Sequence, residues 1–374
     1  MRSLLSINSI LFYNHLIMSQ HRACGFLAFC GTYHSRYLKY NKYNCHENIS
    51  TGFRITTAKD MLMRRAQKQS SVYEKKLFFS STNSDNKNNN NNNMMSVELL
   101  ADQLANSKYT KIIALVGAGV SCSAGIPDFR TPGSGLYDQL QRYNLPFPEA
   151  IFELNYYQQN PLPFIHLCKE IWPGQENGPK PTLSHAFLKL LGDKKWLHRI
   201  YTQNIDGLEA LAGISTDKLV ECHGHFRSST CIGCQKSMSI EDCRKTIIIE
   251  GSVPICTACG SLVKPNIVFF GEKMPLRFQE LISKDMEECD LLLILGTSLL
   301  VTPVADIPSW VSSNCPRILL NRELVGDFIG RSGGDGASSN DLFLQGDCDD
   351  SVQKICDLAN WREEMEILRS RKIQ

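Results

Sequence analysis

The apolar positions of residues 96–374 follow two patterns that alternate along the chain. Short unbroken apolar runs predict strands buried on both faces, and apolar residues three or four positions apart predict amphipathic helices. The runs that predict strands are Lys111–Val116, Arg199–Thr202, Lys218–Cys222, Ile267–Phe270, Leu291–Leu295, Arg317–Leu320 and Leu342–Leu344. The segments that predict helices are Val97–Ala105, Glu149–Leu154, Leu183–Leu191, Ser351–Ala359 and Glu363–Arg369. This alternation predicts an α/β fold with a doubly wound, mostly parallel sheet that helices cover on both faces.

Residues 1–70 show neither pattern and contain ten Lys or Arg residues against two acidic ones. A basic, acid-poor segment of this kind is typical of a mitochondrial transit peptide, so we predict that residues 1–79 target the protein to the mitochondrial matrix. The alternatives are a secretory signal built on the interrupted stretch Leu4–Phe12, and a disordered basic tail that leaves the protein in the cytoplasm or nucleus. Residues 80–95 contain six consecutive asparagines, Asn88–Asn93, and predict a disordered linker. The folded core is expected to span residues 96–374.

The formal net charge of the chain is +2, but the net charge of residues 1–70 differs in sign from that of the remaining residues. Residues 1–70 carry +8, so the remaining residues carry −6. A mildly acidic core argues against nucleic acid as a partner. No apolar run reaches the ~18 residues of a membrane span, so no membrane partner is expected either. The fifteen cysteines are an odd number, and their spacing fits a reduced compartment better than a disulfide framework.

Glycines directly after the first predicted strand indicate a phosphate-binding turn. Gly117-Ala118-Gly119 permits a tight turn and lets backbone N–H groups approach a pyrophosphate. The alternative is a plain strand-to-helix turn without a ligand. Cys122 stands where the dehydrogenase fingerprint has its third glycine, so the loop suits a dinucleotide in a different layout. Pro127 opposes the helix that a dehydrogenase would form next, and the Asp, Phe and Arg of residues 126–130 predict a cofactor lid.

Two Cys-x-x-Cys pairs, Cys231/Cys234 and Cys256/Cys259, are separated by 21 residues. Four thiolates at this spacing can close a tetrahedral zinc site, which leaves no position for a substrate and therefore predicts a structural metal. Two disulfides are the alternative, which a reducing compartment disfavours. A nucleic-acid-binding ribbon is a further alternative, but the three basic and three acidic residues between positions 231 and 263 offer little affinity for phosphate.

Polar side chains follow two neighbouring predicted strands. Thr202-Gln203-Asn204-Ile205-Asp206-Gly207 lies at the carboxyl end of one strand, where ligands bind in doubly wound sheets. Glu221-Cys222-His223-Gly224-His225-Phe226 ends the next strand. Either histidine could titrate near neutral pH and act as a general base.

These segments occur in the same order in sirtuins, which the chain resembles over roughly residues 97–370. Further shared motifs are Pro265-Asn266-Ile267-Val268-Phe269-Phe270-Gly271-Glu272, Leu295-Gly296-Thr297-Ser298 and Leu320-Asn321-Arg322-Glu323. The resemblance is nearest to the class I branch of mitochondrial and cytoplasmic NAD-dependent protein-lysine deacetylases. It implies a large Rossmann-like lobe and an inserted smaller lobe with a zinc ribbon at about residues 223–264. NAD would be a co-substrate in the cleft between the lobes, and one zinc ion would be structural.

The resemblance also implies a role for individual residues. His223 would be the catalytic base, and Asn204 and Asp206 would orient the nicotinamide ribose and carboxamide. The residues expected to contact or enclose NAD are Gly117, Ala118, Gly119, Ala124, Asp128, Phe129, Arg130, Gln203, Asn204, Asp206, Gly296, Thr297, Ser298, Asn321, Glu323 and Cys348. The residues expected to pair with an acetylated protein segment as an added strand are Val268, Phe269, Gly271 and Glu272. Cys231, Cys234, Cys256 and Cys259 would hold the zinc.

The implied reaction moves the acetyl group of acetyl-lysine to ADP-ribose and releases nicotinamide and O-acetyl-ADP-ribose. The alternatives are a protein ADP-ribosyltransferase, a deacylase for other uncharged acyl groups, and a zinc-ribbon binding protein with a vestigial NAD site. Asn266 replaces the aspartate usual in its motif, and His225 replaces a small residue, so peptide preference is open at both positions. No Arg or Lys lies between Arg130 and Arg142, where the desuccinylating branch carries a Tyr/Arg pair, so uncharged acyl groups are favoured. We expect a monomer.

Overall fold

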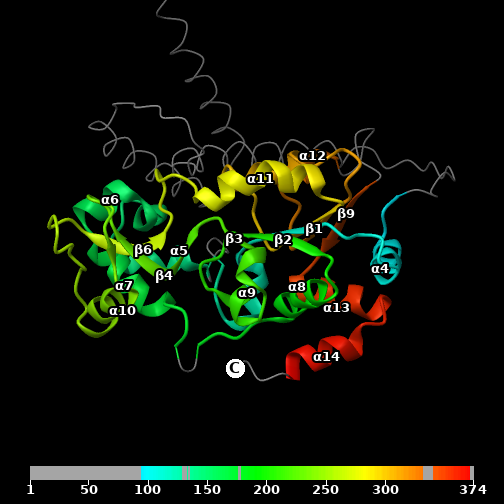
Figure 1. Cartoon of the computed structure of the whole chain (residues 1–374), viewed down its shortest axis with the longest axis horizontal. Coiled ribbons are helices and arrows are strands. Elements are labelled where there is room, and N and C mark those ends of the chain that lie inside the picture. Colours follow the sequence, from blue (N-terminus) through cyan, green and yellow to red (C-terminus); the bar gives the residue numbers. More distant parts are fainter. Residues whose placement is uncertain (1–93, 129–132, 134, 176–177, 332–339, 371–374) are drawn as a thin grey trace, which may run out of the picture. The chain divides into compact units, whose positions relative to one another are not determined.

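The computed structural model describes residues 94–128, 133, 135–175, 178–331 and 340–370 (Figure 1). The predicted targeting segment and nearly all of the predicted linker therefore lie outside the described residues. Phe129 and Arg130, which were predicted to close over a cofactor, also lie outside them.

In the part of the chain that the structure describes, six strands form one fully parallel sheet in the order β3-β2-β1-β7-β8-β9. The strands are β1 (Ile112–Val116), β2 (Leu197–Thr202), β3 (Leu219–Glu221), β7 (Leu291–Leu295), β8 (Arg317–Asn321) and β9 (Asp341–Gln345). Every residue of β1 and β7 is buried, which is why both read as unbroken apolar runs. The chain winds outward from β1 in both directions, so the strand order reverses between β1 and β7. This confirms the predicted doubly wound, Rossmann-like sheet.

Helices cover both faces of this sheet. In Figure 1, α11 (Leu276–Glu288) and α12 (Phe328–Arg331) lie on one side of the strands, and α8 (Leu183–Asp193) and α13 (Cys348–Leu358) lie on the other. The further helices outside the small lobe are α4 (Val97–Ala105), α5 (Leu136–Gln139), α9 (Leu208–Leu211) and α14 (Arg362–Ser370), with short 3-10 turns at Ala118–Ala124, Leu140–Tyr143, Thr216–Lys218 and Val304–Ser309. Side chains from α4, α8, α13 and the sheet form one continuous buried apolar cluster.

A second sheet is inserted between β3 and β7. Its antiparallel strands, in the order β5-β4-β6, are β4 (Gly224–Cys231), β5 (Ser237–Met238) and β6 (Val263–Ile267). A short helix α10 (Ile240–Arg244) and a π-helical turn (Lys245–Ile249) fill the gap between the two cysteine pairs. The helices α6 (Leu154–Gln159) and α7 (Leu162–Ile171), with a 3-10 turn at Pro148–Phe152, gather near β4 and β6 (Figure 1).

Two predicted elements differ from the observed ones, and two of the longer helices were not predicted. The strand expected at Ile267–Phe270 lies earlier, at β6, because pairing with β4 begins at Val263, opposite Cys231. The helix expected at Glu149–Leu154 is a 3-10 turn followed by α6. Helices α7 and α11 were not predicted; α11 begins directly after Pro275 and has a largely polar sequence with few buried positions.

Candidate active site and metal centre

The glycine turn after β1 lies directly against the turn after β7, at the point where the strand order reverses. Gly119 donates its N–H to Gly296 O at 2.8 Å. A Cβ atom on Gly119 would meet Gly296 Cα at 2.5 Å, and one on Gly117 would meet Gly296 O at 2.7 Å. Gly296 itself has φ +59°, in the left-handed region that favours glycine. These two turns therefore require glycine because backbone meets backbone between β1 and β7.

A cavity of about 410 Å³ opens at this edge of the sheet. Its volume falls within the ~300–1,000 Å³ of small-molecule sites, and its position outside the carboxyl ends of the strands is where doubly wound sheets bind ligands. Fourteen residues that the sequence analysis proposed line it: Gly117, Ala118, Gly119, Asp128, Gln203, Asn204, His223, Val268, Gly296, Thr297, Ser298, Asn321, Glu323 and Cys348. The cavity therefore brings together segments that lie up to about 230 residues apart in the sequence.

Hydrogen bonds fix the polar segment after β2. The Asn204 amide donates to Gly117 O at 3.1 Å, and the Gln203 amide donates to Thr297 Oγ1 at 2.8 Å. The Asp206 carboxylate accepts from Ser121 Oγ at 2.7 Å and from the Leu208 N–H at 2.9 Å. Asn204 is only 6% exposed. This segment therefore ties the ends of three strands together and holds its own side chains in fixed positions.

His223 lies on the cavity wall, and its hydrogen bond defines its basic nitrogen. The ring Nδ1 lies 2.9 Å from Gln203 O. A carbonyl oxygen can only accept, so Nδ1 carries the proton in the neutral ring and Nε2 keeps the lone pair. His225 is not among the residues that line the cavity in the described part of the chain, and its Nδ1 accepts the Arg227 N–H at 3.2 Å. Burial lowers the pKa of His225. Of the two histidines left open by the sequence, His223 has the geometry of a general base.

Behind the polar segment lies a buried group of three titratable side chains. One ring nitrogen of His185 and one carboxylate oxygen each of Asp206 and Glu209 lie within 4.8 Å of one another. Burial, together with the negative charge of Asp206, raises the pKa of Glu209 to about 8. Burial lowers the pKa of His185 to about 4. His185 Nδ1 lies 3.2 Å from the Thr182 backbone nitrogen and 2.8 Å from Thr182 Oγ1, and Glu209 accepts from Thr202 Oγ1. The three side chains therefore form a buried titratable group behind the cavity wall, in which His185 and Glu209 are held by neighbouring threonines.

The segment after β6 crosses close to His223. Val268 donates its N–H to His223 O at 2.8 Å, and Phe270 donates to Phe152 O at 2.8 Å. Gly224, next to His223, has φ +77°, and a Cβ there would meet Asn266 O at 1.9 Å. The glycine after the histidine therefore allows β4 and β6 to approach at the place where the histidine enters the cavity.

Several proposed site residues do not line the cavity. Ala124, Asp206, Phe269, Gly271 and Glu272 are outside its wall. Asp206 supports the wall through Ser121, and Glu272 turns toward the protein interior, where it accepts the Phe269 N–H at 2.6 Å.

The cavity wall also contains residues that sequence reasoning missed. These are Cys122, Phe152, Ile205, Ile267, Phe270, Val301, Arg322, Val325, Gly346 and Asp347. Arg322 and Asp347 form an ion pair at 2.5 Å across the ends of β8 and β9. Their position directly after two predicted strands was the signal that could have revealed them.

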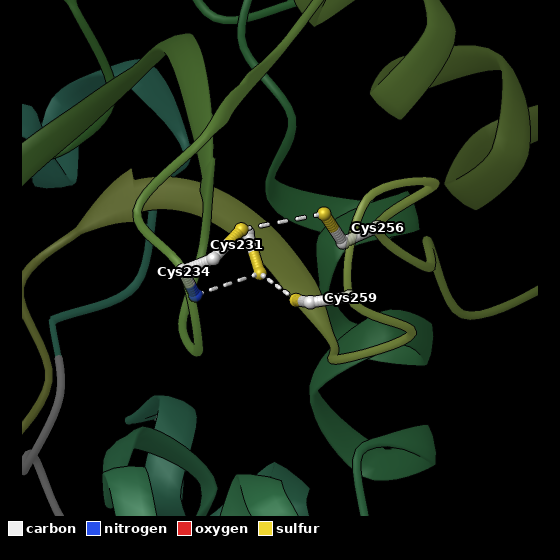
Figure 2. Close-up of side chains that lie close together, drawn as sticks. All are labelled: Cys231, Cys234, Cys256 and Cys259. Atoms are coloured by element: carbon white, nitrogen blue, oxygen red, sulfur yellow. Dashed lines mark hydrogen bonds between the residues drawn. The ribbon is translucent and has the colours of Figure 1, made fainter.

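The four predicted cysteines converge in the small lobe (Figure 2). Cys231 Sγ lies 3.5 Å from Cys259 Sγ, and Cys234 Sγ lies 3.6 Å from Cys256 Sγ. Four sulfurs bound at ~2.3 Å in a regular tetrahedron would be about 3.8 Å apart, whereas a disulfide requires ~2.05 Å. The arrangement therefore fits one zinc ion and contradicts two disulfides.

Backbone N–H groups point at the sulfurs of Cys231 and Cys256, a contact that favours the thiolate form. The Gly233 and Cys234 N–H groups point at Cys231 Sγ at 3.4 Å, as does the Ala258 N–H at Cys256 Sγ. A hydrogen bond from Ser261 lowers the pKa of Cys259 to about 6. Since the thiolate is the form that binds metal, the turns of both cysteine pairs prepare the site for zinc.

Fold and site together define a dinucleotide-binding α/β protein with an inserted four-cysteine lobe. A sequence model described as the Sir2 family matches residues 117–303. The chain is 46% identical over 272 residues to the NAD-dependent protein deacetylase hst2 of Schizosaccharomyces pombe, covering 73% of this chain and 79% of that protein. It is 45% identical over 277 residues to the NAD-dependent protein deacetylase sirtuin-3 of Mus musculus, covering 74% and 80% respectively. It is 44% identical over 290 residues to the NAD-dependent protein deacetylase sirtuin-2 of Danio rerio, covering 74% and 76%. The chain belongs to the Sir2 family, and these relatives agree with the class I branch expected from its motifs.

Among the described residues, no helix combines the length and apolar character needed to cross a bilayer.

Proposed function

We propose that the protein is an NAD-dependent protein-lysine deacetylase. The observation that carries the proposal is the shared cavity of His223, Asn204 and the two glycine turns. A general base on the same cavity wall as a dinucleotide cradle is placed to act on the bound nucleotide. The relatives, whose names describe NAD-dependent protein deacetylases, support the same activity.

The residues present fit NAD as a co-substrate. The glycine turns after β1 and β7 bring the backbone to the cavity wall without side chains in the way, and Asn321 and Glu323 lie on the same wall. Bound NAD would supply a ribose carbon that becomes electrophilic as nicotinamide departs. Asn204, fixed by Gly117, would orient the nicotinamide end, and Asp206 would support Asn204 through Ser121; such positioning lowers the barrier more than a strong acid would. His223 Nε2 would then accept a proton from a ribose hydroxyl.

Acyl-lysine would enter on an extended protein segment. The backbone of Val268–Gly271 follows β6, and Val268 lines the same cavity as His223. The N–H groups of Val268 and Phe270 already bond to His223 and Phe152, so a bound segment would pair with the remaining groups, the Val268 carbonyl and the Gly271 backbone. The expected products are the unmodified lysine, nicotinamide and O-acetyl-ADP-ribose.

A panel of acyl-lysine peptides with NAD tests this function. We expect the acetyl peptide to lose its acetyl group only when NAD is present, with O-acetyl-ADP-ribose appearing by mass spectrometry. An ADP-ribosylated protein without loss of acetyl would instead support a transferase on the same fold. Matched acetyl, butyryl and succinyl peptides would define the acyl range, and we expect the succinyl peptide to react slowest.

Zinc would serve the structure and not the reaction. The four cysteines would occupy all its positions, which leaves none for a substrate. The small sheet carries β6 and the start of β4, and these elements position the proposed peptide segment and His223. Zinc would therefore act on catalysis only by holding the small lobe folded.

Residues 1–79 would target the protein to mitochondria. Their excess of Lys and Arg over acidic residues supports this proposal. Fusion of residues 1–79 to a fluorescent reporter tests it, with a variant of the same fusion in which the Arg residues are replaced by Gln as the control. A diffuse signal from the unaltered fusion would contradict the proposal.

A further inference from the structure

The peptide-binding segment proposed above is held from beneath by a buried ion pair. Lys264 of β6 is 5% exposed, and its Nζ lies 3.0 Å from Glu272 Oε2. The same ammonium donates to Ile267 O at 2.6 Å and lies 4.5 Å from the centre of the Phe269 ring. A buried lysine is costly unless its charge is paired and its donors are satisfied, and here both conditions are met.

Glu272 completes the arrangement from the other end of the segment. Its Oε2 accepts the Phe269 N–H at 2.6 Å, and its own N–H donates to Phe269 O at 3.0 Å. The ammonium of Lys264 thus links the carbonyl that ends β6 to the carboxylate that binds Phe269. Residues 267–272 are closed into a short ring of polar contacts directly behind Val268.

Aromatic packing fixes this ring against the small lobe. The Phe269 ring is fully buried and lies edge-on to Phe164, with ring centres 4.8 Å apart. Tyr157 packs on Phe269 at 5.7 Å and donates its hydroxyl to Val263 O at 2.9 Å. Phe269 therefore points inward, and with this ring of contacts the segment presents Val268 and Phe270 to the cavity.

We propose that the Lys264–Glu272 ion pair is a positioning device for acyl-lysine peptides, which fixes the backbone of residues 268–271 beside the cavity that the acyl-lysine would enter. This inference rests on the proposed deacetylase function. It assigns Glu272 an indirect role, since its carboxylate is committed to Lys264 and Phe269, and it gives Lys264 a role that the motif alone does not reveal. Neither residue is a catalytic residue, because neither is part of the cavity wall.

The two charges of this ion pair depend on each other. Burial lowers the pKa of Lys264, although the charge of Glu272 opposes this effect. Removal of either partner leaves the other ion poorly paired, whereas removal of both charges leaves a neutral, hydrogen-bonding site. The two substitutions should therefore be strongly non-additive in their effect on peptide binding.

Direct binding of a fluorescent acetyl-lysine peptide to the full chain, measured by anisotropy, tests the proposal. For Lys264→Met we expect peptide affinity and peptide KM to worsen by about tenfold or more, because small displacements of a binding segment have large effects. The KM for NAD and the zinc content should stay unchanged, and kcat should change by less than about twofold. The double variant Lys264→Met/Glu272→Gln should recover much of the lost affinity.

Two controls make the outcome specific. Lys284→Met removes a lysine that is 74% exposed and should leave peptide binding intact. Ile282→Ala removes a buried side chain of α11 and should lower Tm without changing peptide KM. If wild type neither binds nor deacetylates the peptide, the proposed function fails. If wild type does both and Lys264→Met binds equally well, or loses peptide only in proportion to Tm, the positioning role is wrong.

Discussion

The two sheets of this protein are stabilised by different means. The parallel sheet joins its helices in a large continuous cluster of buried apolar side chains. In the three-stranded sheet, the cysteine end packs in a small cluster of Cys231, Cys256 and Val263, with Met238 against it. Burial can hold the parallel sheet, whereas the cysteine end of the small sheet has few apolar contacts, and bound zinc would supply the difference there. The proposed peptide segment follows the small sheet, whereas the glycine turns proposed to hold the nucleotide belong to the parallel sheet.

Removal of a zinc ligand should give the largest difference between the two sheets, because only the small sheet would depend on the metal. Structural zinc contributes roughly 10–16 kcal/mol to small lobes, so Cys256→Ser should abolish metal binding and unfold the small sheet. We expect amide hydrogens of β4 and β6 to lose protection from exchange while those of β1 and β7 keep it. Metal analysis and hydrogen exchange measure both effects. Cys243→Ala is the control, because this buried cysteine lies between the two pairs without joining the group of four.

Disruption of the glycine contact should act on the strong sheet instead. A Cβ on Gly119 would overlap Gly296, so Gly119→Ala should weaken NAD binding by at least tenfold and destabilise the fold by roughly 1–3 kcal/mol. Zinc content should remain at about one equivalent per chain. Calorimetric titration with NAD measures the loss.

A glycine on α8 provides the matched control for this prediction. Gly192 lies in a helix, and the nearest atom to an added Cβ is Leu197 Cδ2 at 3.8 Å. Gly192→Ala should therefore leave NAD affinity unchanged and stabilise the protein by about 0.5–1 kcal/mol. Equal effects of the two substitutions on NAD binding would contradict the cradle.

The smallest effect concerns Glu209 and the pH dependence of stability. Its folded pKa of about 8 exceeds the ordinary value of 4.5, so between these pH values the unfolded chain loses a proton that the folded chain retains. This group therefore lowers stability progressively as pH rises from about 4.5 to 8, and has no further effect above. Glu209→Gln should escape that loss and gain roughly 1–3 kcal/mol over wild type at pH 8, with little gain at pH 4.

Thermal unfolding across this pH range measures the effect. Glu287→Gln, at an exposed position of α11, should give a curve parallel to wild type. A constant offset between Glu209→Gln and wild type at all pH values would show that the carboxyl group of Glu209 titrates normally in the folded chain.

Sequence patterns predicted the strong sheet better than the weak one. Lys111–Val116 and Leu291–Leu295 were recognisable because central strands are apolar on both faces, and the zinc ligands because their spacing is set by the metal. Residues 267–270 were placed in a strand from their apolar character. Their burial comes instead from Phe269 packing on α6 and α7, a contact that periodicity does not encode.

Side chains that act through others escaped prediction for a similar reason. Lys264, Glu209 and Arg322 are ordinary charged residues in the sequence, and their roles depend on partners from other elements. The glycines and histidine of the site were recognisable because close backbone approach and proton transfer each demand a particular residue type. Charged supports carry no such local signature.

The central claim is that His223, held by Gln203 O, is the base that completes the reaction in the shared cavity. A deacetylation assay with NAD and an acetyl-lysine peptide, with products identified by mass spectrometry, compares wild type with His223→Ala and His225→Ala. The claim predicts that His223→Ala forms O-acetyl-ADP-ribose on the order of 10²–10⁴-fold more slowly while still binding NAD, and that His225→Ala stays close to wild type. Full product formation by His223→Ala, or loss of activity in His225→Ala alone, would contradict it.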